Sequence, residues 1–181
     1  DFSRWDAAQS LLATYIKLNV NRHQQGQPLS LPIHVADAFR AILLDEKIDP
    51  ALAAEILTLP SANEMAELFA IIDPLAIAAV REALTRTLAK ELADEFLAVY
   101  NANKLDGYRV EHADIGKRSL RNTCLRYLAF GDTELADKLI SAQYHHADNM
   151  TDALAALAAA VAAQLPCRDA LMQEYDDKWH Q

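Results

Sequence analysis

A site for metal-dependent hydrolysis would be recognisable in a sequence from the spacing of its histidine and carboxylate residues. A catalytic zinc of the protease type takes two ligands from an H-E-x-x-H helix, in which one helical turn places both imidazoles on one face and the glutamate activates water. The chain has six histidines: His23, His34, His112, His145, His146 and His180. None is followed by Glu, and none has a second His four residues later. The zinc-protease motif is therefore absent from these 181 residues.

Other pairings of acid and imidazole give weaker metal signals. Three pairs lie within one helical turn: His34 with Asp37, His145 or His146 with Asp148, and Asp177 with His180. The last is the nearest approach to the Glu-x-x-His pattern of di-metal bundles, but its acid is the shorter Asp and it has no second copy. A solvated polar face, or a helix end where protonated His suits the dipole, explains each pair better.

Nucleophile and phosphate-loop motifs are also missing. The chain contains no G-x-S-x-G and no glycine-rich phosphate loop. Cys124 and Cys167 lie among apolar residues on expected helices, outside any C-x-x-C pair, so both are expected to be buried, reduced thiols. We expect no catalytic, cofactor-binding or metal-binding residue in this chain.

Four basic residues gather on one expected helix: Lys117, Arg118, Arg121 and Arg126. Positions 117 and 121, and less well 118, share a helical face. This face could meet an acidic partner surface, although a solvated face with ion pairs is the simpler interpretation.

An acidic and aromatic segment ends the chain. Tyr175 and Trp179, with Asp176 and Asp177 between them, could line a pocket for an amine or a peptide end. Aromatic residues four apart on a helix are equally typical of a core. We therefore favour a core or domain interface for Tyr175 and Trp179.

Composition limits the classes of protein that can hold these residues. The chain is 24% charged and 52% hydrophobic, as in one soluble globular domain or two small ones. A net charge of −9 and a pI of about 5.0 repel phosphate backbones, so no nucleic-acid partner is expected. The alanine-rich run from Ala153 to Leu165 is too short to span a bilayer.

Sequence signals for helix starts and ends occur along the whole chain, and no long segment alternates polar and apolar residues with a period of two. The caps and breakers predict about nine helices. They are expected over residues 3–24 with Ser3 as N-cap, from Pro32, after Asp49-Pro50, from the Ser61–Glu64 capping box, over 74–102, from 110 to a C′ glycine at Gly131, from Asp132 to 146, over the alanine-rich segment, and at the end. The fold class is all-α, with stacked antiparallel helix pairs in a HEAT- or armadillo-like superhelix, an α-solenoid.

Four collinear blocks resemble bacterial aminopeptidase N, a family of zinc metalloaminopeptidases of the gluzincin type. They are residues 2–9, 34–40, 44–53 and 149–181. The resemblance places residues 1–181 in the N-terminal and middle part of that family's C-terminal helical domain, with the catalytic domain and the last helices outside the chain. The start at Asp1 without Met agrees with a fragment. The family's zinc ligands and catalytic glutamate have no matching position here.

The resemblance implies a zinc-dependent aminopeptidase of the alanyl type as the parent, releasing N-terminal residues from peptides in the cytoplasm. The helical part would cover the catalytic cleft and restrict access without being catalytic itself. Its partners would be the missing catalytic domain and, in the parent, peptides. Self-association through exposed apolar surfaces, including Trp5 and Trp179, is a further expectation. The alternative is a free-standing helical-repeat module that binds peptides or proteins; a helical enzyme with its own site has less support.

Overall fold

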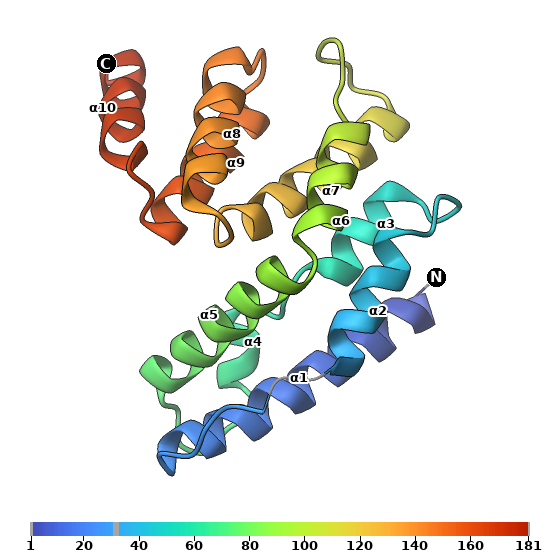
Figure 1. Cartoon of the computed structure of the whole chain (residues 1–181), viewed down its shortest axis with the longest axis vertical. Helices are drawn as coiled ribbons and strands as arrows, with labels where there is room; N and C mark the ends of the chain where they lie inside the picture. Colours follow the sequence, from blue (N-terminus) through green and yellow to red (C-terminus); the bar gives the residue numbers. More distant parts are fainter. Residues whose placement is uncertain (1, 31–32, 181) are drawn as a thin grey trace.

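The computed structural model describes residues 2–30 and 33–180, and every regular element within these ranges is an α-helix (Figure 1). Ten helices lie in them: α1 Phe2–Gln24, α2 Ile33–Leu43, α3 Pro50–Leu57, α4 Ala62–Ala66, α5 Pro74–Glu91, α6 Ala93–Ala102, α7 His112–Leu128, α8 Thr133–His146, α9 Met150–Ala163 and α10 Arg168–Trp179. The all-α prediction is confirmed. The expected start of a helix at Pro32 lies outside the described residues.

Side-chain caps begin several helices where the sequence predicts them. Asp49 accepts a hydrogen bond from the Leu52 amide at 3.0 Å, and Asp73 accepts one from the Ala76 amide at 3.0 Å, each with proline next in the chain. Ser61 and Glu64 form the reciprocal capping box of α4. Asp132 caps α8 through the Leu135 amide at 2.8 Å. These bonds satisfy amide hydrogens that the first helical turn leaves without partners.

Two predicted helix ends are wrong. Ser3 lies inside α1 and is not its N-cap. Helix α7 ends at Leu128 with Ala129 as C-cap, and Gly131 has no positive φ, so it is not a left-handed C′ residue. The Gly131 amide instead donates to the Leu128 carbonyl at 3.1 Å, which closes a tighter turn.

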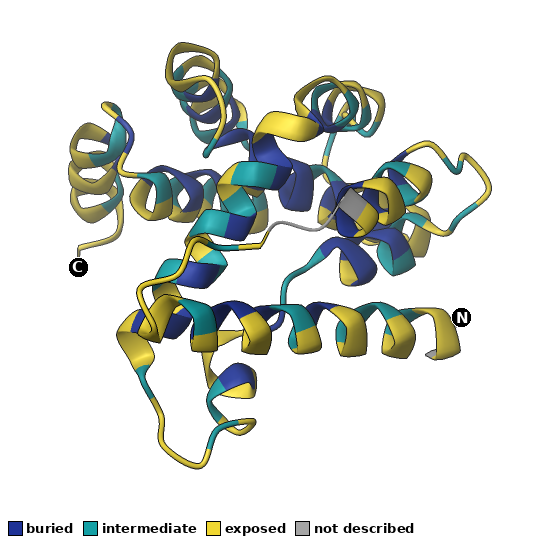
Figure 2. Ribbon diagram, turned by 60° about the horizontal axis from the view of Figure 1, so that its bottom comes forward, coloured by how far each residue is buried: buried dark blue, intermediate teal, exposed yellow. Residues whose placement is uncertain are grey.

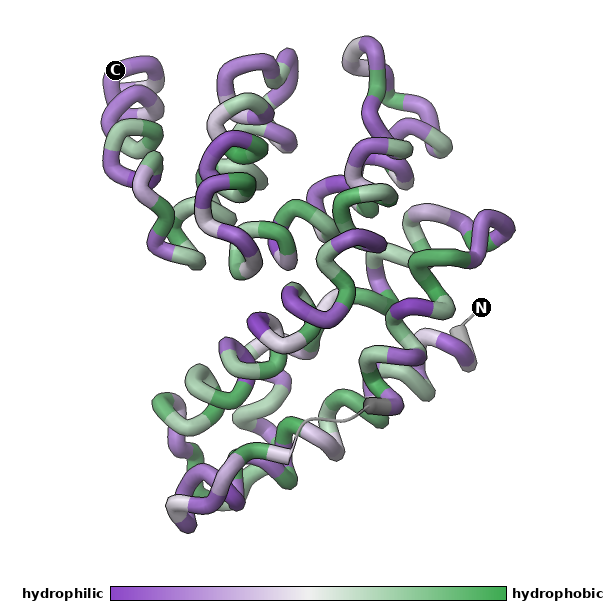
Figure 3. Tube along the Cα trace, viewed as in Figure 1, coloured by the Kyte–Doolittle hydropathy of each residue, from purple (hydrophilic) through white to green (hydrophobic). Residues whose placement is uncertain are grey.

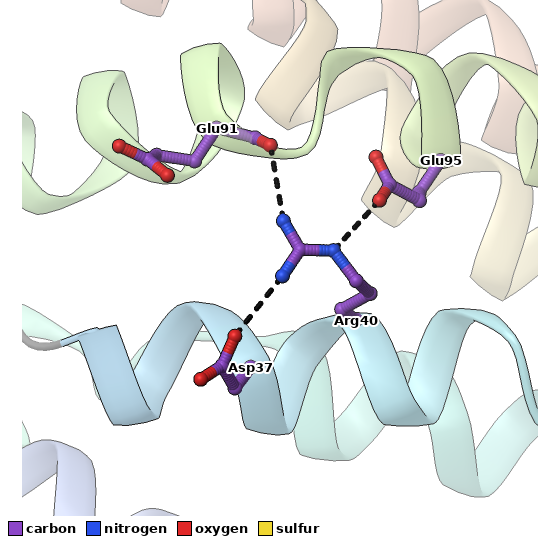
Figure 4. A network of polar contacts seen from close by, with 4 residues as sticks. All are labelled: Asp37, Arg40, Glu91 and Glu95. Carbon is purple, nitrogen blue, oxygen red and sulfur yellow. Dashed lines mark hydrogen bonds and ion pairs between the residues drawn. The ribbon is translucent and has the colours of Figure 1, made fainter.

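The long helix expected over residues 74–102 is two helices, and this split makes ten helices of the expected nine. The chain breaks at Leu92, which is fully buried and has φ −122° and ψ 25°. The Arg40 guanidinium of α2 lies at the break (Figure 4): Nε donates to Glu95 of α6 at 2.8 Å, and Nη2 approaches the Glu91 carbonyl at the end of α5 at 3.5 Å. Nη1 donates to Asp37 at 3.0 Å. A tertiary contact, rather than a local breaker residue, therefore accompanies this break.

Helix α7 is the centre of the molecule and contacts α3, α5, α6, α8 and α9. The pairs α2–α3, α6–α7 and α8–α9 follow one another, and α10 packs on α9 (Figure 1). Helices α1, α4 and α5 contact one another at the other end of the molecule. Successive helices from α4 to α10 contact one another, which produces the stacked arrangement expected from the sequence.

Each helix buries one face and exposes the other (Figure 2). At the centre, the Phe96 ring stacks on Tyr127 with centroids 4.5 Å apart, and Phe39 meets Tyr127 edge-on at 6.0 Å. The Tyr127 hydroxyl donates to the Leu57 carbonyl at 2.5 Å, and burial raises the Tyr127 pKa. This aromatic centre connects α2, α3, α6 and α7.

Small residues set the closest helix contacts. Gly116 of α7 faces α3, where an added Cβ would lie 3.1 Å from the Ala51 backbone nitrogen. In α9, Ala156, Ala159 and Ala160 are buried. Helix α9 is largely hydrophobic, whereas α10 is mostly hydrophilic (Figure 3). The alanine-rich sequence of α9 therefore serves close packing within the stack.

Candidate functional site

A cleft of about 520 Å³, lined by both polar and apolar surface, lies beside α6, α7 and α8, next to the loops that precede α7 and α9. Its lining includes Tyr100 of α6, Arg118 and Arg121 of α7, Gln143 of α8, and Asp148 in the loop before α9. Its volume is within the usual range of small-ligand sites. We describe it below as the α6–α8 cleft.

A buried hydrogen-bond network connects the helices at this cleft. The Gln143 carboxamide accepts from the Tyr100 hydroxyl at 3.0 Å and donates to Asn122 Oδ1 at 2.8 Å and to the Asp152 carbonyl at 3.1 Å. Asn122 Nδ2 donates in turn to Asp152 Oδ1 at 2.8 Å. Tyr100, Asn122 and Gln143 are all buried, and burial is the main cause that raises the Tyr100 pKa. The network joins α6, α7, α8 and α9 through side chains.

Two guanidinium groups of α7 lie against aromatic rings at the cleft. Arg121 Nη2 donates to the Tyr100 hydroxyl at 2.8 Å, and its guanidinium carbon lies 4.4 Å from the centre of that ring. Arg118, only 6% exposed, lies 4.8 Å over the Tyr108 ring and donates to the Arg109 carbonyl at 3.2 Å. Neither arginine forms a salt bridge within residues 2–30 and 33–180.

These positions correct the expectation of a solvated basic face with ion pairs. Arg118 is buried, Arg121 is half-buried, and only Lys117 and Arg126 are exposed. Arg126 donates to Thr123 on its own helix at 2.9 Å. The helical spacing was assigned correctly, but the side of α7 that carries Arg118 and Arg121 faces neighbouring elements.

The carboxylates near the cleft have neutral donors as partners. Asp148 accepts from Asn149 Nδ2 at 3.0 Å and from the Tyr108 amide at 2.8 Å. The Asn149 bond is the main cause that lowers the Asp148 pKa, and the charge of Arg118 adds to it. Asp152 accepts from Asn122 and, at 3.0 Å, from Asn149. The acids are thus hydrogen-bonded by amides.

A second cleft, of about 510 Å³, lies between the α8–α9 connection and α10. Tyr175 and Trp179 line it, and His145 pairs with Glu174 across it at 2.9 Å. Tyr175 is half-buried and Trp179 is 52% exposed, so neither belongs to the core of the described residues, and the domain interface stays a prediction. The predicted exposure is confirmed for Trp179, whereas Trp5 is only partly exposed.

The acids expected beside these aromatics point elsewhere. Asp177 accepts from Gln173 at 2.8 Å, and Asp176 lies 3.6 Å from His180 on its own helix. Neither lines the second cleft. The candidate metal pair Asp177 and His180 is thus divided, with Asp176 beside His180 instead.

The remaining candidate metal pairs are divided among different partners. Asp37 pairs with Arg40, and His34 is exposed. His146 contacts the Ala142 carbonyl at 2.7 Å, while Asp148 belongs to the α6–α8 cleft. In the described ranges, no three His, Cys, Asp or Glu side chains are grouped so that they could hold a metal ion. Zinc binding by the chain stays a matter for titration.

The two cysteines differ in environment. Cys124 is fully buried, and burial raises the pKa of its thiol to about 12. Cys167 is only half-buried, which corrects the expectation that both are buried. Burial and a hydrogen bond with Asp137 raise the Cys167 pKa. Both are free thiols.

Sequence reasoning missed the buried network as a site. Its members are 21 to 43 residues apart in the main pairings, and no local motif connects them. One usable signal was present: polar residues recur four apart on α7 at Asp114, Arg118 and Asn122, and all three are buried. Such a polar stripe inside an otherwise apolar stack marks a site that needs partners.

Comparison with known proteins gives the family. The model of the family described as "Domain of unknown function (DUF3458_C) ARM repeats" matches residues 1–181. The chain is 84% identical to aminopeptidase N of Escherichia coli (strain K12) over 181 residues, which are 100% of this chain and 21% of that protein. It is 44% identical over 178 residues to aminopeptidase N of Haemophilus influenzae, covering 98% of this chain and 20% of that protein. The chain thus spans about a fifth of the length of these curated relatives.

A solved structure supports the fold independently. The crystal structure of Legionella pneumophila aminopeptidase A in complex with aspartic acid matches with a TM-score of 0.79 and 24% identity, covering 98% of this chain and 22% of that one. At this identity the likeness concerns the fold. In the part of the chain that the structure describes, no helix combines the length and apolarity needed to cross a bilayer. The stacked-repeat prediction is confirmed: the chain belongs to the DUF3458_C family of ARM-repeat domains, and along its whole length it is similar to a stretch of aminopeptidase N.

Proposed function

We propose that this chain is the ARM-repeat part of a zinc-dependent aminopeptidase that releases N-terminal residues from peptides. The observation that carries the proposal is the 84% identity, collinear over all 181 residues, to a protein named aminopeptidase N. Identity at this level without a gap in coverage favours a common role for the matching stretch. The proposal assigns residues 1–181 to the N-terminal and middle part of a C-terminal helical domain.

The chemistry would come from the rest of such a protein. This chain contains no H-E-x-x-H, so the zinc ligands and the water-activating glutamate would belong to a catalytic domain elsewhere in the polypeptide. The helix stack would cover the catalytic cleft and admit only short or unfolded peptides. A rigid stack fixed by a central helix suits a wall of this kind. The parent would act in the cytoplasm, without a nucleic-acid partner.

Exposed apolar side chains support contact with another domain. Ile71, Ile72 and Leu75, at the connection from α4 to α5, are 86%, 55% and 82% exposed. Three large neighbouring apolar side chains in water are typical of a surface that another element covers. Self-association through the same surface is the alternative, which light scattering of the isolated chain distinguishes.

Activity and zinc content test the proposal together. We expect the parent protein to hold zinc and to cleave an alanyl anilide, and the isolated chain to do neither. An isolated chain that cleaves the anilide, or that retains one zinc per molecule after dialysis, would overturn the assignment. The covering role predicts that the parent cleaves short peptides much faster than a folded protein with the same N-terminal residues. Equal rates would exclude a restricting wall.

A free-standing ARM-repeat module that binds peptides or proteins is the second candidate. The match to a family described by its ARM repeats agrees with such a module. The upstream reading frame separates the two proposals. A frame that encodes H-E-x-x-H before Asp1 supports the aminopeptidase, whereas a start codon next to Asp1 supports the module.

A further inference from the structure

We propose that the α6–α8 cleft binds the free carboxylate of an amino acid or short peptide, with Arg118 and Arg121 as the recognition residues. This inference goes beyond the proposed function, because it depends only on side chains of this chain. It would hold equally for an aminopeptidase part and for a free-standing module.

The first argument is an imbalance of charge partners. Arg118 is 6% exposed and Arg121 is half-buried, and no carboxylate of the described residues pairs with either. Asp148 and Asp152, two acids that line the cleft, are already hydrogen-bonded by amide and backbone donors. The charge of Arg118 acts on Asp148 and Asp114 without an ion pair, and a ligand carboxylate in direct contact would offset more of the cost of removing the guanidinium groups from water.

The second argument is an unsatisfied donor. Arg121 Nε is buried and has no hydrogen-bond partner. Of the same guanidinium, Nη2 donates to the Tyr100 hydroxyl. Buried donors in proteins nearly always have acceptors, so one that lacks an acceptor marks a position where a ligand or small shift supplies it. A carboxylate has two oxygens and suits the planar fork of arginine.

The third argument is preorganisation. Tyr100 and Tyr108 lie under the two guanidinium planes at 4.4 and 4.8 Å, so neither arginine needs to give up much freedom when a ligand arrives. The arginines are three apart on α7 and therefore neighbours on its surface. Tyr100 is fixed further by Gln143 of the buried network. Tyr100, Gln143 and both arginines are thus held by α6, α7 and α8, whereas Tyr108 belongs to the loop before α7.

The rest of the lining suits the remainder of a peptide. The cleft of about 520 Å³ can hold a molecule the size of a di- or tripeptide. Asn101 and Asn103 contribute carboxamides that can bond a peptide backbone. Lys104 and Asp106 add side chains of opposite charge to the lining, so the cleft as a whole is not uniformly basic. These features favour a carboxylate on an amide-containing ligand over a bare inorganic anion.

Calorimetric titration of the whole chain tests the proposal, with N-acetyl-alanyl-alanine against its C-terminal amide. We expect the acid to bind and the amide to bind roughly tenfold or more weakly, as for loss of a charge-assisted pair. N-acetylglutamate α-amide carries its carboxylate on the side chain. The acid that binds more tightly therefore shows whether the cleft takes a main-chain or a side-chain carboxylate. Inorganic phosphate that binds as tightly as the better acid would overturn the assignment, as would equal binding of acid and amide or no binding of either acid.

Substitutions locate the site. Arg121→Gln is expected to weaken binding of the acid by roughly tenfold or more, and Arg121→Lys to restore little, because a point charge does not reproduce the planar fork. Arg126→Gln is the matched control, since Arg126 is an exposed arginine of the same helix outside the cleft. Arg118→Gln is the second variant if Arg121→Gln changes the unfolding midpoint. Equal loss in the Arg126 variant, or none in folded Arg118 and Arg121 variants, would refute the site. Because the measurement is binding, failure leaves the proposed function untouched.

Discussion

Replacing Gln143 by leucine tests whether the buried network stabilises the fold. Gln143 is 4% exposed, and leucine fills most of its volume without any polar atom. The change removes the acceptor of the Tyr100 hydroxyl and the donors to Asn122 Oδ1 and the Asp152 carbonyl. Arg121 still donates to the Tyr100 hydroxyl and Asn122 Nδ2 to Asp152, but the Tyr100 O–H and Asn122 Oδ1 each lose the partner that Gln143 supplied.

The expected cost follows from how deeply these bonds lie. The Tyr100–Gln143 and Asn122–Gln143 bonds are both fully buried, and the bond to Asp152 is partly buried. A buried group left without its partner costs about 1–3 kcal/mol. At the middle of that range two such groups cost about 4 kcal/mol, and burying leucine recovers up to about 2 kcal/mol, which leaves roughly 2–4 kcal/mol. That is a large share of the 5–15 kcal/mol typical of a domain.

Urea unfolding followed by far-ultraviolet circular dichroism measures this cost. With a slope of about 2 kcal/mol per molar urea, the midpoint should fall by roughly 1–2 M. Gln173→Leu is the control, because Gln173 bonds only Asp177 on exposed α10, and its midpoint should scarcely move. A Gln143→Leu midpoint within about 0.2 M of the parent would refute the reasoning. So would additivity with Tyr100→Phe, since bonded residues should couple.

Three further predictions concern packing, thiol reactivity and acid. Gly116→Ala should lower the free energy of unfolding in urea, because the added Cβ would lie 3.1 Å from the Ala51 backbone nitrogen. That crowding costs about 1–3 kcal/mol and outweighs the helix-propensity gain of alanine, about 1 kcal/mol. A stabilised variant would contradict this prediction. With its pKa raised to about 12, Cys124 should react with iodoacetamide far more slowly than in urea-unfolded chain, as read by mass spectrometry; equal rates would disprove its burial. The Asp73 pKa is lowered chiefly by the Ala76 amide and the Asp114 pKa chiefly by Arg109, so their contribution is present above the unfolded pKa of about 4 and lost as pH falls through the folded values. The thermal unfolding temperature should therefore fall as the pH is lowered below about 4. This fall should be less steep in Asp73→Asn, and an unchanged dependence on pH would count against the stabilising cap.

Local chemistry explains which helix boundaries were predictable. Asp49, Ser61, Asp73 and Asp132 cap helices because an oxygen-bearing side chain reaches amides two or three residues ahead, and both partners are adjacent in the sequence. The break at Leu92 had no such signal. Leucine favours helix, and the interruption accompanies a contact with Arg40 from 51 and 55 residues earlier in the chain.

The site was less predictable than the fold for the same reason. The basic residues on α7 were visible, but charge alone favoured exposure. Their burial depends on Tyr100 and Tyr108, which reach them from other segments. The aromatic end of the chain was predicted as core or domain interface, and α10 packs mainly on α9, with His145 of α8 paired to Glu174, which leaves Trp179 half exposed.

The contacts of Arg40 at the break between α5 and α6 have a consequence for how salt acts on the molecule. One side chain of α2 binds both the last carbonyl of α5 and an acid in the first turn of α6, so it helps to fix the direction of one helix relative to the other. Arg40 and Glu95 are partly open to solvent, so dissolved ions weaken this alignment while leaving the apolar core unchanged. High salt should therefore weaken this contact by at most about 1 kcal/mol, the usual range for a partly exposed ion pair. Lysine at this position would keep the positive charge but would lack the planar set of donors that contacts both helices at once.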